Sequence, residues 1–202
     1  MSATATDNIS ETGLRRTVLI VALANLGYFG VEFGVAVVIG SVSLFADSVD
    51  FLEDASVNLL ILLALGWSGK ARARVGMALA LILLVPGLAT LWTAWQKFSL
   101  PVAPSPVPLS LAGLGALAVN LSCALLLARF RHHGGSLTKG AFLSARNDAL
   151  ANIAIIAAGL VTAFVWRTAW PDLIVGLGIA ALNADAAREV WEAAREEHRA
   201  AA

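Results

Sequence analysis

Cysteine is nearly absent from this sequence of 202 residues, because Cys123 is the only one. A single cysteine excludes a scaffold held by disulfide bonds and a metal centre built from a cluster of cysteines. Charge is also scarce, since Lys, Arg, Asp and Glu make up 14% of the residues, against about 25% in an ordinary soluble domain. The 14 basic and 14 acidic residues balance, so we do not expect the chain to bind nucleic acid.

Hydrophobic residues make up 58% of the chain, and they gather into six apolar runs. A helix of about 20 apolar residues crosses the hydrocarbon core of a bilayer. The runs show no alternation of apolar and polar residues, which a membrane barrel would need. We therefore predict an all-α polytopic membrane protein with six transmembrane helices, at residues 17–40, 44–67, 75–96, 109–128, 141–165 and 170–187.

The basic residues predict how these helices are oriented. Eleven of the fourteen precede the first run, follow the sixth, or lie between the second and third or the fourth and fifth. The positive-inside rule then places both termini in the cytoplasm. The proline-rich stretch 101–108 should be an extended outer connector. The chain divides into a cytoplasmic tail at 1–16, a transmembrane domain at 17–190 and a short charged cytoplasmic tail at 191–202.

Eight of the 14 acidic residues lie inside the apolar runs, and four of these lie in the second run. A carboxylate at the bilayer centre costs about 2.5–3.5 kcal/mol, while a Leu returns only about 0.3–0.6 kcal/mol, so these acids should face protein or water. At helical spacing, Asp50 and Asp54 share one face of the second run, and Ser144 and Asp148 share one face of the fifth. The two helices are antiparallel and carry these groups at overlapping depth, so we expect the two faces to meet.

The segments that carry these acids resemble those of the cation diffusion facilitator family. GSVSLFADSVDFLEDASVNLL is similar to the second helix of that family, and Asp50 and Asp54 match its ligand positions. GAFLSARNDALANIAIIAAGL is similar to the fifth helix, where Asp148 matches the final Asp and Ser144 stands where the family usually has His or Asp. The resemblance covers residues 18–187. Within that family, the chain resembles a short variant that lacks the cytoplasmic domain usually found after the sixth helix.

The resemblance implies a transporter and not an enzyme. It implies export of a divalent cation from the cytoplasm in exchange for protons, with Zn²⁺ favoured over Co²⁺, Cd²⁺ and Mn²⁺. The metal would be a transported substrate and not a permanently bound cofactor, held by Asp50, Asp54, Asp148 and Ser144. The other partners would be protons, the lipid bilayer and, as an option, a second copy of the chain. The expected location is the bacterial inner membrane.

Physical chemistry supports exchange in its own right, because carboxylates that share a site hold a proton when it is empty and lose it to a metal ion. Two other functions stay open. One is a membrane subunit or regulator that keeps the fold with a degenerate metal site, because Ser144 replaces the usual ligand. The other is a membrane transferase that uses magnesium, but Phe51 and Leu52 stand where such an enzyme would continue its motif.

Other polar residues have more than one interpretation. Asp47, Glu53 and Asn147 are predicted to orient the ligands or to line the path of the ion. Asp47 has a structural alternative, a hydrogen bond to Ser43 or to a neighbouring helix.

Three further polar side chains in the apolar runs are predicted to have structural roles. Asp172 lies in the first turn of the sixth run, so we expect it to stabilise the positive end of that helix. Glu32 and Asn25 are expected to make polar contacts between helices.

Overall fold

The computed structural model describes residues 3–64, 88, 90–128, 135–182 and 188, with side chains described from residue 13 onward apart from 61, 63–64 and 135–146. All regular structure in these residues is α-helical, which confirms the predicted all-α class. The long helices are α1 (Ala3–Ile39), α2 (Val42–Ala64), α4 (Pro106–Ala128) and α5 (Gly135–Phe164). Shorter helical stretches lie at 90–99 and at Trp170–Leu182.

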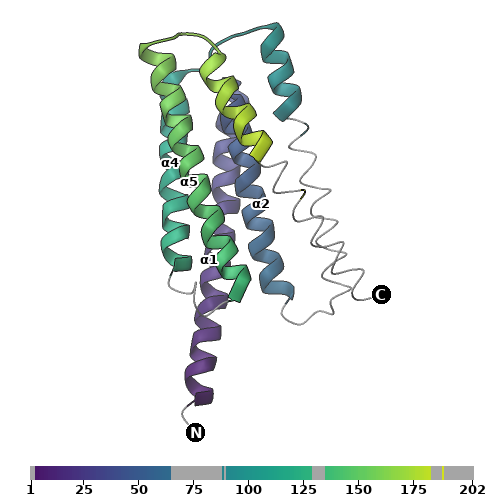
Figure 1. Ribbon diagram of the computed structural model, residues 1–202, viewed down its shortest axis with the longest axis vertical. Coiled ribbons are helices and arrows are strands. Elements are labelled where there is room, and N and C mark those ends of the chain that lie inside the picture. Colours follow the sequence, from purple (N-terminus) through teal and green to yellow (C-terminus); the bar gives the residue numbers. More distant parts are fainter. Residues whose placement is uncertain (1–2, 65–87, 89, 129–134, 183–187, 189–202) are drawn as a thin grey trace, which may run out of the picture.

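The long helices form a bundle whose members run up and down side by side (Figure 1). α1 packs against α2 and α4, and α5 packs against α4 and α2. The start of α1, the ends of α2 and α4, and the start of α5 lie at the lower end of the view, while the turn between α1 and α2 lies at the upper end. α2 and α5 are therefore antiparallel neighbours.

The bundle exposes an apolar surface, and several polar side chains are buried within it. Large hydrophobic side chains such as Val38 on α1 and Leu125 on α4 are exposed, while Asn25, Glu32 and Asp47 are fully buried. This distribution is typical of a protein embedded in lipid. Three segments are long and apolar enough to cross a membrane, namely Gly13–Ile39, Pro106–Ala128 and Asn147–Phe164.

α2 differs from these three segments in charge and not in length. It has 23 residues, which is long enough to span, but it carries Asp47, Asp50, Glu53 and Asp54. Such a helix is tolerated in a bilayer only when its carboxyl groups face protein or water. α2 meets this condition, because it contacts α1, α4 and α5.

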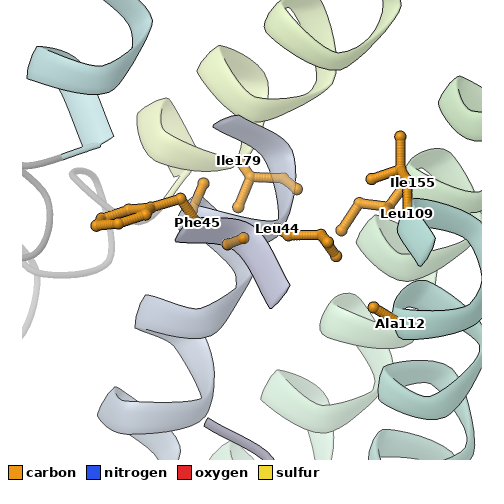
Figure 2. Packing of buried hydrophobic residues seen from close by; sticks show 8 residues of the cluster. Leu44, Phe45, Leu109, Ala112, Ile155 and Ile179 are labelled. Carbon is orange, nitrogen blue, oxygen red and sulfur yellow. The ribbon is translucent and has the colours of Figure 1, made fainter. Parts of the chain in front are cut away.

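An apolar core holds the upper part of α2 against its neighbours (Figure 2). Leu44 points from α2 toward Leu109 on α4 and Ile155 on α5, while Phe45 points the opposite way. Ile179, on the helix Trp170–Leu182, lies against the same core. Leu44 and Phe45 lie within two helical turns of Asp50, so this packing helps to position the acids of α2 relative to α5.

Some boundaries differ from the prediction. α1 begins at Ala3, so the segment expected to be a tail is helical from that residue onward. The proline-rich connector is shorter than predicted, because α4 already begins at Pro106. Proline suits the first turn of a helix, where the missing N–H has no intrahelical partner to lose. The predicted runs at 75–96 and 170–187 lie partly outside the described residues.

Candidate metal site

α2 begins at a tight turn around Gly40. Gly40 has a φ of 63°, in the left-handed region that glycine adopts without steric cost. The Ser41 N–H donates to the Ala36 carbonyl at 3.0 Å and closes the end of α1. The Leu44 N–H donates to Ser41 Oγ at 3.1 Å, which makes Ser41 the N-cap of α2. The turn thereby sets which face of α2 is presented to its neighbours.

Two further amides at the start of α2 are bound by Asp172, which lies on the helix Trp170–Leu182. The Asp172 carboxylate accepts from the Val42 N–H at 2.8 Å and the Ser43 N–H at 3.2 Å. It also accepts from the hydroxyl groups of Ser41 at 2.6 Å and Ser43 at 2.7 Å. A carboxylate at a helix N-terminus is favoured by the helix dipole and by the free N–H groups there. Asp172 therefore caps a helix that is distant in sequence.

Lys97 completes this cluster from the helical stretch 90–99. Its Nζ lies 3.4 Å from Asp172 Oδ2 and also donates to the Gly40 carbonyl. Both charged side chains are buried. The ion pair joins three helical segments at the point where α2 begins.

Two predictions about this region are met only in part. Asp172 does lie in the first turn of its own helix, Trp170–Leu182, but its carboxylate also bonds the start of α2, which was not expected. Of the two structural partners considered for Asp47, Ser43 is not one, since the Ser43 hydroxyl donates to Asp172, whereas Glu32 on the neighbouring helix α1 lies beside Asp47. The cap residue Ser41 is a signal visible in the sequence, whereas nothing local identifies Asp172 as its partner, 131 residues away.

The acids of α2 approach α5 at Asp148. Asp50, Asp54 and Asp148 are all half-buried. The carboxyl groups of Asp54 and Asp148 are within hydrogen-bonding reach of each other. Among the charged groups, Asp148 acts on Asp50 most strongly. Asp148 of α5 therefore pairs with Asp54 of α2, and its charge also acts on Asp50.

Two asparagines add oxygen atoms to the same faces, each one helical turn after an Asp. Asn58 Nδ2 donates to the Asp54 carbonyl at 2.7 Å, and Asn152 Nδ2 donates to the Asp148 carbonyl at 2.5 Å. Their amide oxygens are buried, and no donor in the described part of the chain reaches them. This part of the interface thus has many acceptors and few donors, which suits a cation. The sequence places both asparagines on these faces, but only the structure shows that their oxygens are unpaired.

The remaining predicted site residues differ in position. Glu53 is half-buried on α2, and Asn147 is exposed on α5. Ser144 belongs to α5, but its side chain lies outside the described residues. Asp47 is fully buried and pairs with Glu32 on α1. Among the described side chains, no three His, Cys, Asp or Glu residues lie close enough to hold a metal ion together. In this conformation the described carboxyl groups come together in pairs.

Comparison with known proteins agrees with this architecture. Residues 18–196 match the cation efflux transmembrane domain. The chain is also 27% identical over 155 residues to the cation-efflux pump FieF of Salmonella typhi, in an alignment that covers 69% of this chain and 51% of FieF. The chain thus spans about half the length of this curated relative. Because the family match covers most of the chain, including α2 and α5, the protein belongs to the cation efflux, or cation diffusion facilitator, family of membrane transporters.

Proposed function

We propose that this protein exports a divalent metal cation from the cytoplasm in exchange for protons. The ion is held between α2 and α5 by Asp50, Asp54 and Asp148, with Ser144 as a fourth ligand. The observation that carries this proposal is the approach of Asp148 to both Asp50 and Asp54 across the α2–α5 interface. Glu53 and Asn147 line the path of the ion, and Asp47 supports the ligands from behind.

The paired arrangement of the carboxyl groups supports an exchange mechanism. Ionised carboxylates at close range repel one another, so the empty site retains protons. A divalent cation replaces those protons and draws the carboxylates together. Moving two positive charges outward against an inside-negative potential costs about 4.6 kcal/mol per 100 mV, at about 2.3 kcal/mol per charge. Exchange for two protons removes that cost, which favours an antiporter.

Metal choice follows from the ligand atoms and from the family. Carboxylate, hydroxyl and amide oxygens are hard ligands, which favours Mn²⁺ over softer ions. Zn²⁺ prefers sites that include nitrogen or sulfur. Family membership favours Zn²⁺ as the first cargo to test, followed by Co²⁺, Cd²⁺ and Mn²⁺.

The proposed topology has six membrane spans with both termini in the cytoplasm, in the bacterial inner membrane. The excess of basic residues in the loops assigned to one side supports this orientation. The domain limits at 17 and 190 belong to the same proposal. Exposed apolar faces on α1 and α4 are available to lipid or to a second copy of the chain.

Metal transport into sealed vesicles, with the internal pH recorded at the same time, tests this function. We expect uptake of Zn²⁺ or Mn²⁺ to be accompanied by proton movement in the opposite direction. Asp54→Asn and Asp148→Asn should each abolish uptake while the protein still inserts into the membrane. Ser122→Ala is a suitable control, because that exposed hydroxyl donates to the Ala118 carbonyl within α4. A well-folded protein that moves neither metal nor protons would instead be the non-transporting subunit.

A further inference from the structure

Glu32 on α1 and Asp47 on α2 form a second carboxyl pair, about one helical turn before Asp50 along α2. Both side chains are 0% exposed. Among the described residues, none donates a hydrogen bond to any of their four carboxyl oxygens. The two carboxyl groups lie within hydrogen-bonding reach of each other. The pair is thus more deeply buried than the half-buried carboxylates that face α5.

The stretches of α1 and α2 that hold this pair carry no basic side chain. The chain has no Lys, Arg or His between residues 17 and 69, and α4 has none either. Among the described residues, the titratable groups that face the pair are Tyr28 on α1, Asp50 on α2 and Asp148 on α5, while Cys123 on α4 faces Asp54 and Asp148 instead. Each of them is neutral or negative. No side chain among these can therefore act as a counter-ion.

Tyr28 does not supply the missing donor, because its hydroxyl donates to the Ala112 carbonyl at 2.6 Å. An ionised carboxylate only accepts hydrogen bonds, so two of them in contact cannot bond each other. A proton on one oxygen changes this, because its O–H can donate to the other carboxyl group. The proton also removes the repulsion between two buried like charges.

We propose that Glu32 and Asp47 share a proton and form a buried proton site between α1 and α2, separate from the metal site. Asp47 lies three residues before Asp50 in the sequence, but its partner is on α1, whereas Asp50 and Asp54 approach α5. Under this proposal, a metal ion bound between α2 and α5 displaces the protons there and leaves the proton between Glu32 and Asp47 in place. Loss of the proton in alkaline solution would place two like charges at the α1–α2 contact and weaken it.

Infrared spectroscopy of the full-length protein in lipid tests this site directly, because a protonated carboxyl group has its own carbonyl stretching band. We expect the wild-type protein saturated with Zn²⁺ or Mn²⁺ to keep such a band, since the metal displaces only the protons between α2 and α5. The double variant Glu32→Gln with Asp47→Asn should lose the band. Asp172→Asn is the matched control and should keep it, because Asp172 lies outside the pair and its carboxylate contacts Lys97 and the start of α2.

Absence of the band in the metal-saturated wild-type protein would overturn the proton site without the need for any variant. A double variant that folds and keeps the band would also overturn the proton site. A double variant that binds one metal ion fewer per chain would overturn it too, because the pair would then be a metal site. The test is independent of transport. A protein that transports metal but lacks the band contradicts only this site, and one that has the band but moves no metal contradicts only the proposed function.

Discussion

Lys97 Nζ and Asp172 Oδ2 lie 3.4 Å apart, and this buried ion pair forms part of the cap at the start of α2. Asp172 also accepts from two backbone amides and two serine hydroxyls of the same turn. The stretch 90–99, the helix Trp170–Leu182 and the start of α2 are thus joined through one carboxylate. Because α2 carries the acids that approach α5, this junction contributes to positioning the candidate metal site.

Removal of the Asp172 carboxylate, which joins the three helical segments, should destabilise the protein strongly. Asp172→Ala leaves Lys97 buried without its partner and leaves two amides of α2 unbound. Breaking a buried ion pair in this way costs about 3–5 kcal/mol, so the midpoint of thermal unfolding in detergent should fall by several degrees. Asp172→Asn should lower it less, because one acceptor oxygen remains. An Asp172→Ala protein as stable as the wild type would show that the junction does not hold α2.

The stability of the protein should also depend on close packing between Gly176 and the backbone at the start of α2. A Cβ atom at this position would lie 2.7 Å from the Ser43 backbone nitrogen and 2.7 Å from the Val42 carbonyl carbon. Gly176→Ala must therefore push the helix Trp170–Leu182 away from α2, at a cost of about 1–3 kcal/mol. Gly178→Ala is the matched control, because nothing lies within 4 Å of its Cβ position. Equal unfolding midpoints for the two variants would contradict this packing.

The all-α fold class could be predicted from the sequence because the apolar runs are long and uninterrupted. The start of α4 was predicted less well, because four prolines suggested an extended connector, whereas Pro106 is compatible with a first helical turn. Spacing placed Asp50 and Asp54 on one face of α2. It could not show that Asp47 turns to Glu32, or that Asp172 caps α2, because both depend on contacts between separate helices.

Ser144 gives a test of metal selectivity. An imidazole at this position would add a nitrogen ligand, which Zn²⁺ prefers more strongly than Mn²⁺ does. Ser144→His should therefore raise the ratio of Zn²⁺ to Mn²⁺ uptake, measured by competition between the two ions in the same vesicles. Ser122→Ala should leave the ratio unchanged. An unaltered ratio in Ser144→His would place this residue outside the metal site.

Metal binding should weaken in acid, because the ion and protons compete for the same carboxylates. For each proton released on binding, the apparent dissociation constant should rise by about tenfold per pH unit as the pH falls through the range where those carboxyl groups become protonated. Titration of the purified protein with Mn²⁺ at several pH values measures this slope. A dissociation constant that does not change with pH would contradict exchange of metal for protons.

The number of metal ions bound by single and double variants tests most directly whether α2 and α5 hold one ion together. Equilibrium dialysis of Asp54→Asn and Asp148→Asn should show that each variant loses the same single ion per chain. The variant that carries both substitutions should then lose no more than either one alone. If the two single variants each lost a different ion, so that the double variant lost two, the carboxylates of α2 and α5 would belong to separate sites.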